Sequence, residues 1–144
     1  MRLNLGSGGR PMEGWTNVDR ADIPGVDVVH DLDVLPWPWD DGTVQQAVAQ
    51  DVFEHVGDPI GFMTESHRIL GTGGDLLIKS PHFRHQDAYT DPTHRRFCTP
   101  HTWDYWIKGT PLRERHGPAY GDVDFELVRR EVMAGSIYVH LRKI

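Results

Sequence analysis

Glycines and acidic residues are spaced over the first twenty positions in a way that suits a bound nucleoside. The stretch 3–10 (LNLGSGGR) predicts a short strand followed by a glycine turn, and a second short apolar segment ends at Asp19. Glycine lets the chain bend sharply and lets a ligand lie against the main chain. An ionised Asp19 can accept hydrogen bonds from both hydroxyls of a ribose. The pattern therefore favours a nucleoside-containing cofactor.

Acids also follow the next two predicted strands. The valine-rich stretch 26–31 ends at Asp31 and is followed by Asp33, and Asp51 comes after residues 44–50. Because the carboxyl ends of parallel strands lie at one edge of a sheet, we expect these acids to share a rim with the glycine turn. The rim is the predicted binding crevice.

Residues 80–101 concentrate His and Asp side chains in an irregular segment. A His or Asp within hydrogen-bond reach can take the proton of a reacting hydroxyl and accelerate a reaction by about 10²–10⁴-fold. His82, directly after the fifth predicted strand, and His94 are the candidate bases, and Asp91 is a third.

The neighbouring arginines, Arg95 and Arg96, are candidates for binding a carboxylate or phosphate of a substrate. Residues 82–94 could also bind a divalent metal, although they lack a tight metal-binding spacing, and our main interpretation contains no metal. We expect His55 and His67 to pack against the core, and Trp37 and Trp39 to cover the edge of the sheet.

The predicted secondary structure consists mostly of strands joined by loops, with two helices. Strands are predicted at 2–6, 15–18, 26–31, 44–50 and 75–79, helices at 59–70 and 100–107, and a terminal hairpin at 125–132 and 137–142. Only about eight residues, 7–14, join the first two strands, which is too few for a full crossover helix. The predicted fold class is therefore α/β: a Rossmann-like, mostly parallel sheet with helices on both faces, a trimmed first crossover helix and a C-terminal antiparallel hairpin.

Composition narrows the class of protein. The 144 residues, 38% hydrophobic and 25% charged, predict one domain over 1–144, with 80–123 as an excursion on the substrate side. A net charge of −6 disfavours nucleic-acid binding, and no apolar run is long enough to cross a membrane. The single cysteine fits a reducing compartment, so a cytoplasmic location is expected.

These motifs together resemble the class I S-adenosylmethionine-dependent methyltransferases, specifically the small type 11-like group of bacteria and phages. The resemblance rests on the order and spacing of LNLGSGG at 3–9, GWTNVD at 14–19, DL at 31–32, DDGT at 40–43, AQDVFEHV at 49–56 and LGTGG at 70–74. It implies S-adenosylmethionine as cofactor and S-adenosylhomocysteine as product.

The resemblance also implies roles for individual residues. Asp19 would hold the ribose, Leu32 with Asp31 or Asp33 would flank the adenine, and Gln50 with Asp51 would lie near the sulfonium. The methionine end of the cofactor would contact the glycine turn, through Asn4, Gly6, Ser7 and Gly8.

The predicted reaction is O-methylation of a glycan or a small hydroxylated metabolite. The sequence lacks the Asn/Asp-Pro-Pro-Tyr/Phe motif of DNA methylation. Asn4 and Arg10 replace the usual acid and third glycine of the family, so a non-catalytic module that binds a nucleoside or a partner is an alternative. A metal-dependent hydrolase built on residues 82–94 is a further one. The chain also lacks the helices that often precede the first strand in the family, and we therefore expect a homodimer.

Overall fold

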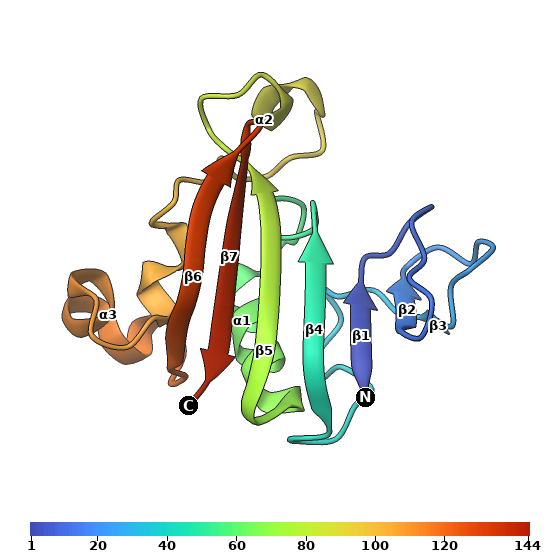
Figure 1. Ribbon diagram of the computed structural model, residues 1–144, viewed down its shortest axis with the longest axis horizontal. Helices are drawn as coiled ribbons and strands as arrows, with labels where there is room; N and C mark the ends of the chain where they lie inside the picture. The colour runs from blue at the N-terminus through green and yellow to red at the C-terminus, as the bar shows by residue number, and fades with distance from the viewer.

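The computed structural model describes all residues 1–144 and contains one seven-stranded sheet in the order β3-β2-β1-β4-β5-β7-β6 (Figure 1). The first five strands are parallel, and β7 runs antiparallel between β5 and β6. The strands are β1 Arg2–Leu5, β2 Thr16–Asp19, β3 Val28–Val29, β4 Val44–Gln50, β5 Leu70–Pro81, β6 Phe125–Met133 and β7 Ser136–Lys143. The strand order changes direction between β1 and β4, the place where sheets of this kind bind ligands.

The predicted third strand is shorter in the structure than expected. Only Val28 and Val29 pair with β2, because the Asp27 carboxylate accepts the hydrogen bond of the Asn17 backbone N–H at 2.7 Å. A side chain thus takes the place of a ladder partner at this edge.

The main helix, α1 Pro59–Ile69, begins where the sequence predicts. Asp58 caps it by accepting a hydrogen bond from the Gly61 N–H at 2.8 Å, and Pro59 occupies the first helical position, where no N–H is needed. The four other helical segments are short: α2 Asp87–Thr90, the 3₁₀ helix η1 Thr102–Trp106, α3 Pro111–His116 and the 3₁₀ helix η2 Gly117–Tyr120.

The helix predicted at 100–107 is therefore reduced to one 3₁₀ segment. The Thr99 hydroxyl accepts from the His101 N–H, and the Thr102 hydroxyl accepts from the Thr99 N–H. These local turns delay the start of the helix by two residues. The predicted terminal hairpin is confirmed, with Ala134 and Gly135 at positive φ (51° and 79°) forming its two-residue turn.

The hydrophobic core lies on one face of the sheet. Inward-facing strand residues such as Leu5, Ala49 and Ile78 are at most 2% exposed. Phe53 links this layer to the helices, because its ring lies 5.8 Å from Phe62 of α1. The tryptophans of residues 37–39 are buried against the same layer, which confirms the packing role predicted for them.

The fold class is confirmed, with one difference in how the sheet is covered. The helix α1 lies behind the sheet in Figure 1, α3 lies at the left beyond β6, and the face toward the viewer carries no helix. Right-handed crossovers from β1 to β2 and from β2 to β3 would place their helices on that second face. Residues 6–15 and 20–27 contain no helix, so most of that face stays open.

A loop replaces the missing first helix over β1 and β2. Asn4 donates hydrogen bonds to Asn17 Oδ1 at 2.9 Å and to the Arg10 carbonyl at 3.1 Å, and Asn17 Oδ1 also accepts from the Met12 N–H. Both asparagine side chains are at most 6% exposed. Two buried amides therefore fix residues 6–15 against the sheet.

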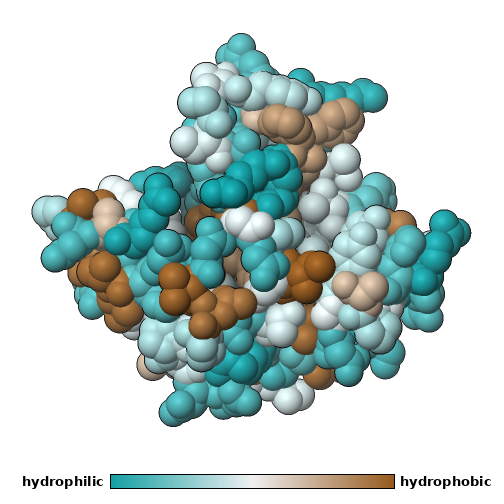
Figure 2. Space-filling model, turned by 180° about the vertical axis from the view of Figure 1, so that it is seen from behind, coloured by the Kyte–Doolittle hydropathy of each residue, from teal (hydrophilic) through white to brown (hydrophobic).

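Seen from the helix side, the surface is mostly hydrophilic, with hydrophobic residues in small separate patches (Figure 2). The segment around α2 stands above the rest of the molecule. None of the helices has the length and apolar character needed to span a membrane.

Candidate functional site

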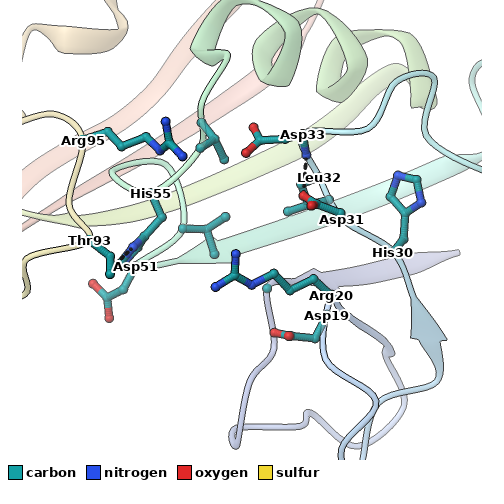
Figure 3. Close-up of a pocket in the computed structure, with 13 residues that line it drawn as sticks. Asp19, Arg20, His30, Asp31, Leu32, Asp33, Asp51, His55, Thr93 and Arg95 are labelled. Atoms are coloured by element: carbon teal, nitrogen blue, oxygen red, sulfur yellow. Dashed lines mark hydrogen bonds between the residues drawn. The ribbon is translucent and has the colours of Figure 1, made fainter.

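A pocket of about 350 Å³ lies at the carboxyl ends of the first four strands (Figure 3). This volume is within the usual range for small-molecule sites. Each of the four strands is followed by residues that line the pocket, and the segment after β5 closes one side of it. The lining residues are Gly6, Asp19, Arg20, His30, Asp31, Leu32, Asp33, Asp51, Val52, His55, Val56, Thr93 and Arg95.

The glycine turn after β1 forms the floor of this pocket. Gly6 has φ +63°, and a Cβ there would lie 2.4 Å from Val52 Cγ2, so the turn tolerates no side chain. The Gly8 N–H donates a hydrogen bond to Asp19 Oδ2 at 2.8 Å. The turn and the acid at the end of β2 are thus held together.

Asp19 keeps capacity for a ligand. Its Oδ2 accepts from Gly8 and its Oδ1 accepts from the Ala21 N–H at 2.9 Å. Each carboxylate oxygen can accept two hydrogen bonds, so one lone pair on each oxygen remains. Two adjacent hydroxyls of a ribose match this arrangement.

The turn after β3 supplies the next part of the wall. Asp31 Oδ1 accepts from the Asp33 N–H at 2.9 Å, and Asp33 Oδ1 accepts from the Gly57 N–H at 2.8 Å. These bonds hold Leu32 at the pocket between two carboxylates. An apolar side chain flanked by acceptors suits a purine ring with an exocyclic amino group.

Asp51, directly after β4, has the backbone conformation of a strained site. Its φ is +54°, a region that non-glycine residues rarely adopt. Its Oδ2 lies 3.0 Å from Lys79 Nζ and 3.4 Å from Arg10 Nη2. Arg10 thereby ties the first loop to the end of β4.

Two histidines and an aspartate meet where β4 and the segment after β5 come together. The rings of His55 and His94 pack edge to face with centroids 4.6 Å apart, and the Nε2 atom of each lies 3.8 Å from Asp91 Oδ2. His55 Nδ1 lies 3.0 Å from the Thr93 hydroxyl. Burial and then the neighbouring His94 lower the pKa of His55, and the Thr93 N–H and hydroxyl lower the pKa of Asp91.

Glu54 lies beneath this group and is 1% exposed. Its Oε2 accepts from the Ser80 hydroxyl at 3.1 Å, whereas its Oε1 is buried and has no hydrogen-bond partner. Burial raises the pKa of this carboxyl. An unpartnered carboxylate oxygen in the interior is costly, and a ligand would relieve that cost.

Several predicted site residues lie outside the pocket. Asn4 faces the loop 6–15, and the Ser7 hydroxyl is buried without a partner. Gln50 is exposed on the open face of the sheet, where it lines a second hollow. His82 stacks on Phe83 with ring centroids 4.8 Å apart.

The two predicted arginines diverge. Arg95 points into the pocket, whereas Arg96 donates to the Phe53 carbonyl and lies over the Phe53 ring, with 5.4 Å from Cζ to the centroid. Burial lowers the pKa of the Arg96 guanidinium. Arg96 therefore holds the segment after β5 to the core.

The structure adds several residues to the pocket lining that the sequence analysis had not assigned to it, among them Arg20 and His55. Arg20 follows the strand-end acid and extends into the pocket, and His55 lines it rather than packing in the core. Their signal in the sequence was position: each lies within four residues of an acid that ends a predicted strand. The expectation for His67 is confirmed, since its ring packs 5.2 Å from Phe125.

A Rossmann-like sheet with a glycine turn after the first strand and an acid at the end of the second is typical of enzymes that bind a nucleoside cofactor. The sequence model of the family described as "Methyltransferase domain" matches residues 7–78, half of the chain. The chain belongs to this family. It is a class I S-adenosylmethionine-dependent methyltransferase, as the resemblance predicted.

Solved structures share the fold at low sequence identity. A SAM-dependent methyltransferase from Thermotoga maritima has a TM-score of 0.71 and 18% identity, over 99% of this chain and 81% of that one. A methyltransferase solved with the Trm112 activator of Haloferax volcanii has a TM-score of 0.69 and 14% identity over the same shares. The 1,6-didemethyltoxoflavin-N1-methyltransferase of Burkholderia thailandensis was solved with S-adenosylhomocysteine. It has a TM-score of 0.62 and 17% identity, over 99% of this chain and 70% of that one. No curated protein sequence matched the chain.

The pocket fits S-adenosylmethionine, the cofactor of this class. Four carboxylates, from Asp19, Asp31, Asp33 and Asp51, face two guanidinium groups, so acidic groups outnumber basic ones in the lining. The sulfonium and ammonium groups of the cofactor are cationic and complement it. Gly8 leaves open space beside the turn, since a Cβ there would meet no atom within 4 Å.

Proposed function

We propose that this methyltransferase transfers the methyl group to a hydroxyl of a glycan or a small hydroxylated metabolite. The observation that carries the proposal is that one pocket is lined both by the strand-end acids and by His55 and Thr93 of the His/Asp cluster. A donor bound at the acids would therefore have its methyl group near groups able to handle a proton.

The chain's own residues would divide the binding of the donor. Asp19 holds the ribose, the pair Asp31 and Asp33 flanks the adenine with Leu32, and the glycine turn lies against the methionine end. When bound, S-adenosylmethionine supplies an electrophilic methyl group on a cationic sulfur. Alignment of donor and acceptor in such a displacement is worth about 7–11 kcal/mol.

The acceptor hydroxyl would bind at His55, His94 and Asp91. Its oxygen bonds to the methyl carbon while the carbon–sulfur bond breaks, and its proton passes to the Asp91 carboxylate. Asp91 suits this role because its Oδ2 lies 3.8 Å from the Nε2 atoms of both histidines and because its side chain is 45% exposed, so the proton can leave to solvent. Arg95, at the same wall, would pair with an anionic group of the acceptor.

Calorimetry with S-adenosylmethionine and S-adenosylhomocysteine tests the donor site. Asp19→Asn keeps the shape of the side chain but removes its charge and half of its accepting capacity. We expect it to weaken binding of both ligands at least tenfold, which corresponds to about 1.4 kcal/mol. Asp22→Asn, an exposed acid three residues further along the chain, is the matched control and should bind like the wild type.

Failure of the wild-type protein to bind either ligand at millimolar concentration would contradict the donor site. The acceptor is tested with a panel of sugars and hydroxylated metabolites, followed by NMR of the product. A methoxy signal is the expected result, whereas methylation of nitrogen alone would contradict the proposed acceptor.

A further inference from the structure

Glu54, His55 and His94 bring three metal-ligand side chains to one point. One oxygen of Glu54 and one ring nitrogen of each histidine lie within 4.8 Å of one another. Ligands around a four-coordinate zinc ion are about 3.4 Å apart, from bond lengths near 2.1 Å. The limit of 4.8 Å exceeds that spacing by about 1.4 Å, so the side chains must move closer together to bind an ion.

The hydrogen bonds around the two histidines leave one lone pair on each ring in the same place. His94 Nδ1 lies 2.8 Å from the Ala88 carbonyl, which can only accept, so Nδ1 carries the proton and Nε2 the lone pair. The Thr93 hydroxyl gives its one proton to Asp91 Oδ1 at 2.7 Å. Thr93 therefore accepts from His55 Nδ1, and the lone pair of His55 is on Nε2 as well.

These two lone pairs converge on a carboxylate rather than on a proton donor. Each Nε2 lies 3.8 Å from Asp91 Oδ2, too far for a hydrogen bond. The buried and unpartnered Oε1 of Glu54 adds another acceptor without a donor. Two imidazole lone pairs beside two carboxylates form an environment that a cation stabilises.

We infer that Glu54, His55 and His94 bind one divalent transition-metal ion of the zinc type at the wall of the cofactor pocket. Two imidazoles and one carboxylate are the ligand set of a catalytic zinc site with an open position. Magnesium and calcium prefer oxygen ligands alone and fit less well. The contacts of Thr93 and Ala88 with the Nδ1 atoms are the outer hydrogen bonds that orient metal-binding histidines.

The open coordination position would face the pocket, because His55 lines the pocket. The His55 side chain is 34% exposed, so an ion can reach the site from solvent. The role of the ion rests on the proposed function: it would bind the acceptor's oxygen beside Asp91, which takes the proton. The existence of the site does not depend on that function.

Metal-stripped protein tests the inference by equilibrium dialysis with Zn²⁺ and by visible absorption of bound Co²⁺. We expect one equivalent of either ion, with the intense Co²⁺ bands of a site of low coordination number. His55→Gln and Glu54→Gln should each weaken Zn²⁺ binding at least about tenfold. His85→Gln, in the same segment but outside the cluster, should leave it unchanged.

Absence of stoichiometric binding, or equal loss in His85→Gln and His55→Gln, would overturn the inference. Thr93→Val provides a second variant, since Thr93 is exposed and its loss should not unfold the protein. The substitution removes the hydroxyl that holds the proton on His55 Nδ1, and it should therefore weaken Zn²⁺ binding about tenfold. Unchanged binding would count against the proposed geometry.

Calorimetry with S-adenosylhomocysteine separates this inference from the proposed function. Protein that binds S-adenosylhomocysteine but no metal would retain the donor site and lose the metal site. Protein that binds one metal ion but no S-adenosylhomocysteine would support the metal site and contradict the donor site.

Discussion

Gly6, Gly8 and Gly9 lie in one turn but meet different physical limits. Gly6 and Gly8 have positive φ, and only Gly6 would bring a Cβ against another side chain, at 2.4 Å from Val52. Gly9 has no positive φ and no neighbour within 4 Å of its Cβ position. A side chain would therefore meet both backbone strain and crowding at Gly6, backbone strain alone at Gly8, and neither at Gly9.

Alanine at each position should give a graded loss of stability. Gly6→Ala should lower the free energy of unfolding by about 2–4 kcal/mol, from strain and overpacking, and weaken S-adenosylhomocysteine binding. Gly8→Ala should cost about 1–2 kcal/mol from strain alone, and Gly9→Ala less than about 0.5 kcal/mol. Urea unfolding measures the series, and equal losses at all three positions would contradict this account.

Thr93 shows how one hydroxyl sets the chemistry of its neighbours. By donating to Asp91 it must accept from His55, which fixes where the imidazole carries its proton. No pattern in the sequence announces this, because residues 55 and 93 belong to segments after different strands. The sequence analysis accordingly assigned His55 to the core.

Among the elements, α1 is joined to the tryptophan loop by one buried carboxylate. Glu65 accepts hydrogen bonds from the Trp37 N–H at 2.6 Å and from Arg68 at 2.8 Å, and Arg68 also donates to the Trp39 carbonyl. Glu65 is 7% exposed. This network fixes the loop that precedes β4 and so supports the turn carrying Asp31 and Asp33.

The Glu65 network should make stability depend on pH. Hydrogen bonds from Arg68 lower the pKa of Glu65 below its ordinary value. The ionised Glu65 therefore contributes fully to the free energy of unfolding above its pKa in the unfolded chain, about 4.3. This contribution is lost as the pH falls through the lower pKa of the folded protein. Glu65→Gln should cost about 2 kcal/mol at pH 7, and its difference from the wild type should shrink in strong acid.

Urea unfolding at a series of pH values measures this difference. Glu13→Gln is the control, because Glu13 is exposed and makes no hydrogen bond through its side chain. A difference between Glu65→Gln and wild type that stays constant down to about pH 2 would show that the carboxylate's charge is not what stabilises the loop.

For the whole molecule, the uncovered face of the sheet is the main consequence of the missing helices. Its middle contains a hollow of about 520 Å³ lined partly by Val48, Leu77 and Tyr138. Apolar side chains in the middle of an open sheet face favour contact with another surface. We therefore retain the prediction of a homodimer formed through this face.

Light scattering tests the dimer, which should have twice the 16.4 kDa mass of the chain. Leu77→Lys places a charge at the centre of the open face and should shift the protein toward the monomer. Val128→Lys, on the exposed edge strand β6, is the matched control. A wild-type mass of 16.4 kDa at all concentrations would refute the prediction.

Much of the fold could be predicted from local patterns. Strand and helix positions follow from hydrophobic periodicity and caps, as the agreement at α1 and at the terminal hairpin illustrates. The shortness of β3 and the 3₁₀ form of η1 escaped prediction, because Asp27, Thr99 and Thr102 form side-chain hydrogen bonds that compete with regular structure.

For the site, local patterns were enough to predict the glycine turn and the strand-end acids, because the carboxyl ends of parallel strands must meet at one edge of the sheet. Which face of the sheet stays open and which histidines meet depends on how distant segments pack. His55 and His94 are brought together by the packing of two distant segments. Their lone pairs are then set by contacts with Thr93 and Ala88, which no spacing along the chain encodes.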